Sequence, residues 1–313
     1  MSKTAFIFPG QGSQVEGMGK DFYEAHDWAR EIFSLADEVT GKPITRLCFE
    51  GPMEELTQTV NLQPAMTAVN LVCLKALTEK GLKPDAAAGH SLGEYTALAA
   101  AGVITEADCL NLVNKRGELM QAAADKRPGA MQAIIGLNKA QVEEITEQAR
   151  DKGVVQAANL NTPGQIVITG EAEAVAAAGE LAVAQKARAV PLAVSGAWHS
   201  PLMDTAAQEF AGLIEEVKFS SPTCELYLNV IGQAETDPVQ IKSIMARQIT
   251  SSVRWYEIIE NMLTSGVTGF VEVGPKKVLA GFNRKIVPKG SEAKTLSVAD
   301  IPGLDKVLET LTG

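Results

Sequence analysis

A serine lies between two glycines in the segment GHSLG, residues 89–93. The pattern G-x-S-x-G is typical of a sharp turn from a strand into a helix, in which only glycine neighbours leave room and the serine hydroxyl is exposed. The dipole and the free N–H groups at that helix N-terminus favour a developing anion. The segment therefore predicts Ser91 as a nucleophile, although a tight turn with a solvated serine would show the same five residues.

A serine nucleophile needs a base, and the chain offers three histidines, His26, His90 and His199. His90 adjoins the serine, but consecutive residues around a turn point in different directions, so we expect His90 to be structural. His26 lies among charged residues and is expected at the surface. His199 follows a predicted strand in a loop of small residues, and such loops bring distant groups to a nucleophile. We predict His199 as the base, with a histidine that merely caps the next helix as the alternative.

Arg116 is a charge within an apolar stripe. The stripe follows spacings of three and four residues on the helix expected after Thr105. An inward-facing arginine is costly unless it meets an anion. The anion is either a structural carboxylate, with Glu94 and Glu118 as candidates, or the carboxylate of a substrate, which suits the guanidinium fork.

The glycine-rich segment FPGQGSQ, residues 8–14, does not match known phosphate-binding loops. It lacks the G-K-[ST] of a P-loop and the G-x-G-x-x-G spacing of a dinucleotide site. We predict that the backbone N–H of Gln11 opposes that of Leu92, so that the two form an oxyanion hole. A simple turn is the alternative.

The elements that position these residues predict an α/β fold in two parts. Strands expected at residues 4–8, 85–90, 226–230 and 269–273 alternate with helices, which favours a parallel sheet in an α/β-hydrolase-like domain. Residues 130–194 follow the order β-α-β-β-α-β, which is ferredoxin-like. We therefore predict a catalytic domain from residues 1–127 and 197–313, an inserted ferredoxin-like domain at residues 128–196, and an active site between the two.

Composition limits the class of protein. The chain has 313 residues and a net charge of -10, which argues against a general nucleic-acid binder. No apolar stretch approaches the roughly 20 residues that span a bilayer, and the first residues lack a signal-peptide pattern. The four cysteines lie far apart without a CxxC pair, which is typical of reduced thiols and predicts a cytoplasmic protein; no membrane partner is expected. Three histidines argue against a histidine-rich metal site.

Seven segments occur together in one order. They are FPGQGSQ, QPA at residues 63–65, GHSLGEY, Arg116, NTPGQIVITG, SGAWHSPLM and EVGP at residues 272–275. Over nearly the whole chain this set resembles the malonyl-CoA:acyl carrier protein transacylases of bacterial fatty acid synthesis. The resemblance implies that Ser91 is the nucleophile, that His199 is its base, and that the amides of Gln11 and Leu92 hold the oxyanion.

The same resemblance implies a ping-pong reaction. The serine takes malonyl from malonyl-CoA, and the pantetheine thiol of acyl carrier protein then collects it. Coenzyme A is thus a substrate, and no cofactor is expected. Arg116 would clamp the malonyl carboxylate, Gln63 and Trp198 would line the substrate site, and Gln248 would orient the histidine in place of a third acid. Trp198 replaces a usual phenylalanine, so we expect lower tolerance of branched malonyl groups.

Docking of an acidic carrier protein to an acidic chain requires a local cationic patch. Five cations lie between Glu272 and Glu292 with no acid among them. They are Lys276, Lys277, Arg284, Lys285 and Lys289. We predict docking at this segment, with Lys186 and Arg188 nearby; a solvated helix face is the alternative. Lys276 also replaces a glycine that is usual in the resembling family.

Three other functions remain open at this point. A free-standing acyltransferase of a polyketide pathway would use the same residues to load a different carrier protein. A serine esterase or thioesterase would share GHSLG, but it would want Asp or Glu behind His199 and has no use for Arg116. A non-catalytic scaffold would form no acyl-enzyme at all.

Overall fold

The computed structural model describes residues 3–194 and 196–312. Within them, six strands form a large sheet: β1 (Lys3–Phe8), β2 (Ala86–Gly89), β7 (Glu225–Tyr227), β8 (Ala234–Glu235), β9 (Val267–Val273) and β10 (Lys294–Val298). Their order is β10-β9-β1-β2-β7-β8. All neighbours are parallel except β8, which pairs antiparallel with β7. Because β1 and β2 are central, the chain segments that follow them meet at one edge of the sheet.

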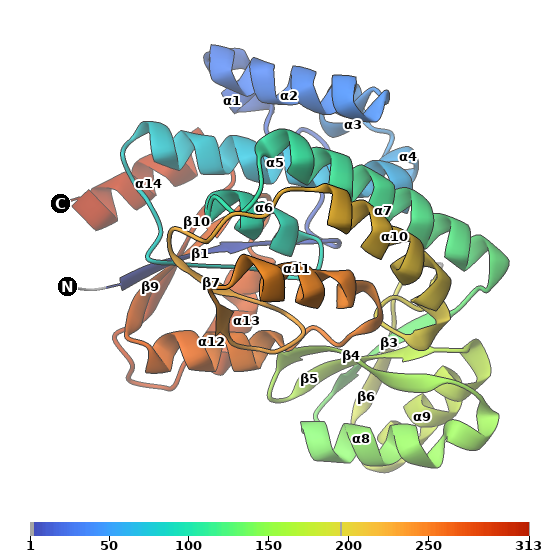
Figure 1. Ribbon diagram of the computed structural model, residues 1–313. Coiled ribbons are helices and arrows are strands. Elements are labelled where there is room, and N and C mark those ends of the chain that lie inside the picture. The colour runs from blue at the N-terminus through green and yellow to red at the C-terminus, as the bar shows by residue number, and fades with distance from the viewer. Residues whose placement is uncertain (1–2, 195, 313) are drawn as a thin grey trace.

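Helices cover both faces of the large sheet (Figure 1). Side chains alternate along β1, so Phe6 and Phe8 join the core beneath α5 and α7, whereas Ala5 and Ile7 face α12 and α13. The helices are α1 (Lys20–Ala25), α2 (Asp27–Thr40), α3 (Ile44–Glu50), α4 (Met53–Leu56), α5 (Thr59–Glu79), α6 (Gly93–Ala100), α7 (Glu106–Lys126), α10 (Asp204–Glu216), α11 (Pro238–Ala246), α12 (Trp255–Thr264), α13 (Val278–Ile286) and α14 (Ile301–Thr312), with 3-10 turns η2 (Pro201–Met203) and η3 (Gln248–Thr250). No helix in the described ranges is both long and apolar enough to cross a membrane.

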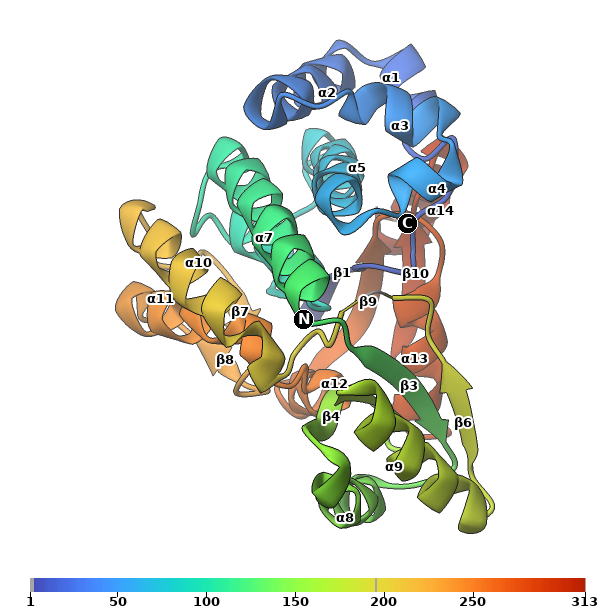
Figure 2. The same cartoon turned by 90° about the vertical axis from the view of Figure 1, so that its right-hand side faces the viewer.

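A smaller antiparallel sheet lies beside the large body (Figure 2). It contains β3 (Ala130–Ile135), β4 (Val155–Thr162), β5 (Gln165–Gly170) and β6 (Arg188–Pro191), with α8 (Lys139–Gln148), the 3-10 turn η1 (Arg150–Lys152) and α9 (Ala172–Ala184). Its order is β4-β5-β3-β6. The helices α8 and α9 cover one face, and the other face, with Met131 and Val167, joins the main core. The predicted fold class, a parallel α/β sheet with a small α+β unit, is confirmed; the domain boundaries remain a prediction.

Backbone hydrogen bonds join the small sheet to a segment of the large body. The N–H of Leu160 in β4 donates to the carbonyl of Val253, and the N–H of Val253 donates to Ala158, each at 2.8 Å. Val253 precedes α12 of the large body. Strand β4 is therefore held directly against the segment that follows η3, and this contact brings the small sheet to the same edge as the serine turn.

Two predicted strands differ from those observed. The strand expected at residues 226–230 ends at Tyr227, and the chain then turns, with the N–H of Leu228 bound to the carbonyl of Gln233. The last strand of the ferredoxin-like order, which was expected to run to residue 194, spans Arg188–Pro191. By contrast, the alanine strand at residues 86–89 forms as expected, because its fully buried small side chains fit the centre of the sheet. The early end of β7 matters most, since it frees Asn229 to turn toward the serine.

Candidate active site

Ser91 occupies a tight turn between β2 and α6, at the carboxyl end of a central strand. Its φ of 50° lies in the left-handed region, which is uncommon for residues other than glycine. The two glycines cannot carry side chains here: a Cβ on Gly89 would lie 1.9 Å from the carbonyl carbon of Gly93, and one on Gly93 would lie 2.0 Å from the Phe8 oxygen. The turn is thus as sharp as the segment GHSLG predicts, and it presents the hydroxyl at the start of α6.

His199 contacts the serine directly. Its Nε2 lies 2.7 Å from the Ser91 Oγ, while its Nδ1 lies 2.9 Å from the Ser251 carbonyl and 3.1 Å from the Gln248 carbonyl. Because carbonyls only accept, the hydrogen must be on Nδ1, which leaves Nε2 free to accept the proton of the hydroxyl. Among the described residues, no carboxylate contacts the ring, so two main-chain oxygens take the place of a third acid.

The environment of His199 disfavours its protonated form. Burial, followed by the nearby Arg116 cation, lowers the pKa of His199 to about 3. The residue is also held from the small sheet, since Gln156 Nε2 on β4 donates to the His199 carbonyl at 2.7 Å. His199 itself has a φ of 60°, a left-handed conformation. The ring is thus neutral at pH 7 and fixed from both bodies.

The other two histidines face away from the serine hydroxyl. His90 Nε2 lies 2.8 Å from Asn161 Oδ1 on β4, and its ring lies 5.5 Å from that of Trp255. His26 stacks on Trp28 at the start of α2, with ring centroids 4.8 Å apart. Neither is placed to take a proton from the serine.

Arg116 lies in α7 and is 1% exposed. Its Nη1 donates to Gln63 Oε1 at 3.0 Å, and its Nη2 donates to Ser91 Oγ at 3.2 Å and to Gln248 Oε1 at 3.0 Å. Its Nε has no partner in the described part of the chain. The guanidinium carbon lies 5.6 Å from the Tyr95 ring centroid. A buried cation with an unused donor therefore lies directly beside the Ser91 hydroxyl.

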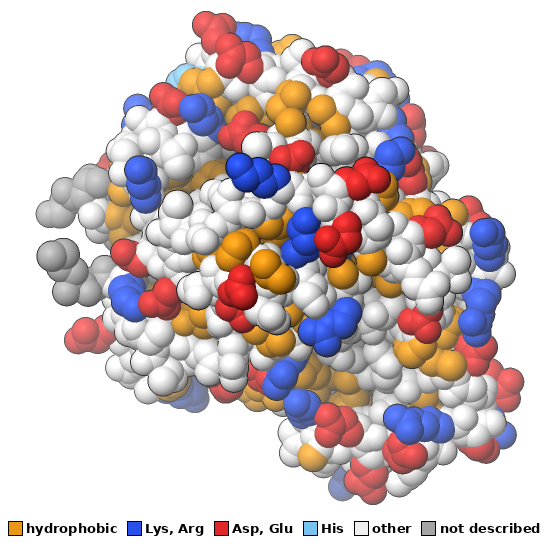
Figure 3. Space-filling model, in the orientation of Figure 1, with side chains coloured by type: hydrophobic (Ala, Val, Ile, Leu, Met, Phe, Trp, Pro, Cys, Tyr) orange, Lys and Arg blue, Asp and Glu red, His pale blue; other side chains and the backbone are white. Residues whose placement is uncertain are grey.

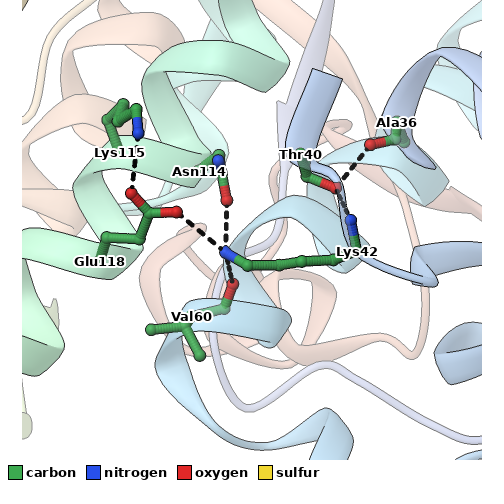
Figure 4. A network of polar contacts seen from close by, with 7 residues as sticks. All are labelled: Ala36, Thr40, Lys42, Val60, Asn114, Lys115 and Glu118. Carbon is green, nitrogen blue, oxygen red and sulfur yellow. Dashed lines mark hydrogen bonds and ion pairs between the residues drawn. The ribbon is translucent and has the colours of Figure 1, made fainter. Parts of the chain in front are cut away.

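Glu118, one of the two carboxylates considered as a structural partner for Arg116, faces Lys42 instead (Figure 4). Lys42 Nζ donates to Glu118 Oε1 at 3.2 Å, to Asn114 Oδ1 at 2.6 Å and to the Val60 carbonyl at 3.2 Å. Lys42 therefore ties α7 to the first turn of α5, the two helices that carry the arginine and its glutamine partner.

The serine turn is held by a buried network of one carboxyl group, Glu94, and two carboxamides, Gln248 and Asn229. Gln248 Nε2 donates to the Ser91 carbonyl and to Glu94 Oε2, each at 2.8 Å. Glu94 Oε1 accepts the backbone N–H of Asn229 at 2.7 Å. Asn229 in turn binds the N–H of Ser91 and the carbonyl of Gly89, both at 2.7 Å. Burial raises the pKa of Glu94 to about 7.

The two amides predicted to bind an oxyanion lie at the same edge. A Cβ on Gly10 would lie 2.5 Å from the His90 carbonyl and 3.5 Å from the Leu92 nitrogen, so the loop after β1 packs against the serine turn. Among the described residues, none accepts a hydrogen bond from the N–H of Gln11 or of Leu92. Both donors are therefore available to a ligand.

Trp198 is 5% exposed and lies over the preceding loop. A Cβ on Gly196 would lie 2.4 Å from the indole ring. The indole Nε1 has no partner in the described ranges. Ser195, the first residue of the segment SGAWHSPLM, lies outside the described residues. Across the ranges that the structure covers, no group of three or more His, Cys, Asp or Glu side chains could hold a metal ion.

The side chains of the predicted cationic patch contact different parts of the molecule. Lys276 has a φ of 61°, as suits the glycine it replaces, and its Nζ reaches the Gly12 carbonyl at 3.4 Å. Lys285 Nζ donates to Gln165 Oε1 in the small sheet at 3.2 Å. Lys277 and Arg284 line a surface hollow of about 460 Å³. On the face shown in Figure 3, basic side chains lie interspersed with acidic ones rather than in a single field.

Three residues that complete the site were not predicted from the sequence. Asn229 lies two residues after the end of β7, and its position near the carboxyl end of a strand was the available signal. Ser251 acts through its carbonyl, so its side-chain type carries no signal. Gln156 lies on the small sheet, and its approach to His199 depends on how the two sheets pack.

Comparison with known proteins identifies close relatives along the whole chain. Residues 5–309 match the acyl transferase domain family. The chain is 42% identical to a malonyl CoA-acyl carrier protein transacylase of Bacillus subtilis (strain 168), over 99% of this chain and 98% of that protein. An acyl carrier protein S-malonyltransferase of Vibrio cholerae superposes with a TM-score of 0.93 at 42% identity, covering 98% of this chain and 100% of the other. A malonyl-transacylase solved in complex with its type II PKS acyl-carrier protein superposes with a TM-score of 0.94 at 38% identity, covering 99% of this chain and 100% of that one.

Proposed function

The chain belongs to the acyl transferase family, as an enzyme of the malonyl CoA-acyl carrier protein transacylase group, and we propose that it carries malonyl from coenzyme A to acyl carrier protein through Ser91. The carrier protein would be that of fatty acid synthesis. Coenzyme A enters only as part of the substrate. The cytoplasmic location stays a prediction.

The first half-reaction forms an acyl-enzyme. Ser91 Oγ attacks the thioester carbonyl of malonyl-CoA while His199 Nε2 accepts its proton, and the N–H groups of Gln11 and Leu92 bind the resulting oxyanion. Collapse of the tetrahedral intermediate breaks the C–S bond, and the imidazolium returns the proton to the departing coenzyme A thiolate. The 2.7 Å contact between Nε2 and Oγ supports this role.

The second half-reaction runs the same steps in reverse. His199 takes the proton of the pantetheine thiol, the thiolate sulfur attacks the malonyl ester, and the proton returns to Ser91 Oγ as the C–O bond breaks. Water could take the place of the thiol, which is the esterase alternative. The absence of a carboxylate behind His199, among the described residues, and the presence of Arg116 both favour transfer over general ester hydrolysis.

The observation that carries the proposal is the buried Arg116 guanidinium, 3.2 Å from the nucleophilic oxygen. A malonyl group on the serine would place its free carboxylate within reach of this cation, which suits a bidentate pair. An acetyl group would leave the cation without an anion, at a cost of about 1–3 kcal/mol. The enzyme should therefore prefer malonyl to acetyl.

The decisive experiment is intact mass measurement after brief mixing with malonyl-CoA or acetyl-CoA. We expect a malonyl adduct on the native protein, none on Ser91→Ala, and much less adduct from acetyl-CoA. In Arg116→Ala the preference should be lost. Equal adducts from both thioesters on the native protein would refute the selectivity argument, and no adduct from either would refute the enzyme.

Carrier docking is proposed on the side where Lys285 meets the small sheet. Lys285 contacts Gln165, which pairs with Ile135, and Ile135 pairs on its other side with Arg188. Strand spacing therefore puts Gln165 and Arg188 about 10 Å apart, so cations from both bodies border one surface. Charge reversal at Lys285 should raise the KM for carrier protein and leave the rate of malonyl loading unchanged; an unchanged KM would contradict this surface.

A polyketide carrier is the second candidate acceptor. It is favoured by the relative solved with a type II PKS acyl-carrier protein. The two can be separated by measuring kcat/KM with a fatty acid carrier protein and with a polyketide carrier protein. A higher value with the polyketide carrier would favour this alternative.

A further inference from the structure

Glu94 is a fully buried carboxylate that the proposed chemistry does not use. It lies in the first turn of α6, three residues after the nucleophile, and is 0% exposed. Its two oxygens accept the N–H of Asn229 at 2.7 Å and the Nε2 of Gln248 at 2.8 Å. Among the described residues, no salt bridge joins it to a cation. A charge kept at such a desolvation cost requires a reason.

The first consequence of this carboxylate is the orientation of a carboxamide. The Gln248 NH₂ group donates to Glu94 Oε2 and to the Ser91 carbonyl, so both of its neighbours on this side act as acceptors. The oxygen of the same amide is then directed to Arg116, whose Nη2 donates to it at 3.0 Å. Glu94 and the Ser91 carbonyl together direct an acceptor, rather than a donor, toward the arginine.

The second consequence is that the carboxylate and the guanidinium are kept apart. A direct ion pair would occupy the forked donors of Arg116 with a permanent anion. With Gln248 between them, Glu94 does not contact the guanidinium, and Arg116 keeps its Nε unpartnered in the described part of the chain. The arrangement holds the arginine in place, and in the described ranges no carboxylate of the chain forms a salt bridge with it.

We propose that Glu94 is a positioning residue that fixes the Gln248 carboxamide, and through it holds Arg116 in the orientation that selects a malonyl group. This inference rests on the proposed function, because the selection is exercised on the acyl group carried by Ser91.

The isosteric change Glu94→Gln tests the proposal. The new side chain offers one oxygen and one NH₂, so it can satisfy Asn229 or Gln248 but not both. If Gln248 flips to accept from the new NH₂ group, its own NH₂ faces the Arg116 guanidinium, and a donor again meets a donor. We expect the ratio of kcat/KM for malonyl-CoA to that for acetyl-CoA to fall at least about tenfold, as for loss of a hydrogen bond to a charged group.

Glu272 provides a matched control. It is likewise 0% exposed, and it accepts the N–H groups of Leu279 at 3.0 Å and Ala280 at 2.8 Å at the start of α13. Glu272→Gln therefore removes one acceptor from an equally buried carboxylate outside the serine site. Its malonyl-to-acetyl ratio should stay within about twofold of the native value. An unchanged ratio in a folded Glu94→Gln protein, or an equal change in both variants, would overturn the proposal.

Thermal unfolding tests the same contact without using activity. In the double variant Glu94→Gln with Gln248→Glu, the new NH₂ at position 94 meets an acceptor and the new carboxylate meets Arg116, while the Ser91 carbonyl loses the donor that Gln248 supplied. The two new contacts should outweigh that one loss. We expect the double variant to unfold at a higher temperature than Glu94→Gln alone, and to fold even if that single variant does not. A double variant no more stable than Glu94→Gln overturns the positioning role. A native enzyme without malonyl preference would instead refute the proposed function.

Discussion

His90 and His199 lie beside the same serine turn, but only His199 contacts the serine hydroxyl. His90 adjoins Ser91 in sequence, yet its Nε2 is bound to Asn161 and its ring packs between Trp255 and Phe282. His199 lies 108 residues away from Ser91 along the chain, yet its Nε2 is 2.7 Å from the serine oxygen. Adjacency along the chain therefore says little about which histidine reaches the hydroxyl.

Strand β4 of the small sheet contacts both histidines, but through different groups. Its Asn161 binds the ring of His90, whereas its Gln156 binds only the backbone carbonyl of His199. The first contact occupies an imidazole nitrogen that a base would need. The second leaves both ring nitrogens of His199 to the serine and to the carbonyls behind it. The difference shows that β4 anchors one histidine by its ring and positions the other by its backbone.

Removal of each imidazole should separate the two roles most strongly. We expect His199→Ala to lower kcat for malonyl transfer about 10²–10⁴-fold, the range for loss of a general base. His90→Ala should lower it less than tenfold, because His90 contacts no reacting atom. Stopped-flow measurement of coenzyme A release checks both, with Ser91→Ala as the inactive reference. Comparable losses of kcat in the two histidine variants would contradict the assignment of His199, rather than His90, as the base.

The protonation of His199 gives a second test. Burial and the Arg116 cation lower the pKa of His199 to about 3, and burial also lowers the pKa of His90. Between pH 3 and 6.5 the unfolded chain would bind a proton at His199 that the folded chain does not, so this residue reduces stability as the pH falls through that window. An NMR titration should find the His199 ring neutral at pH 5, with assignment from His199→Gln. A midpoint at or above 6.5 would contradict this environment.

The backbone contact of His199 should matter less than its ring. Gln156→Ala removes the side chain that donates to the His199 carbonyl at 2.7 Å, and it leaves the imidazole intact. Loss of one such hydrogen bond is worth about 1 kcal/mol, so we expect kcat to fall roughly fivefold with little change in the KM for malonyl-CoA. Steady-state kinetics with malonyl-CoA and carrier protein check this value. A loss as large as that of His199→Ala would mean that the backbone contact determines the ring position entirely.

The sequence predicted most of the elements that converge on the site, because their signals are local. The glycines of GHSLG force a turn, and the apolar stripe around Arg116 places it inside. The ferredoxin-like order could be read from alternating elements alone. These features depend on residue type and spacing within one or two elements, which are visible in a single chain.

The remaining parts of the site depend on contacts that residue type does not encode. The His199 ring is oriented by the carbonyls of Gln248 and Ser251, and any residue at those positions has a carbonyl. The backbone of His199 is left-handed, a conformation that usually signals glycine, so the residue type at this position does not predict it. Asn229 was taken as part of a strand, and only the early end of β7 frees it. Long-range packing of the two sheets, rather than local pattern, sets these positions.

The ring contact of His90 should have the smallest effect on rate, and it should appear in stability instead. Asn161 is 5% exposed and its Oδ1 lies 2.8 Å from His90 Nε2. Asn161→Ala removes this acceptor and leaves a polar ring nitrogen in a half-buried aromatic pocket, which should cost about 1 kcal/mol of unfolding free energy. Because no reacting atom loses a partner, kcat for malonyl loading should stay within about twofold of native, below the loss in Gln156→Ala. Chemical denaturation and coenzyme A release, measured on both variants, check the pair. If Asn161→Ala lowers kcat more than Gln156→Ala does, then β4 controls the serine turn through His90, and the division between an anchoring and a reacting histidine is wrong.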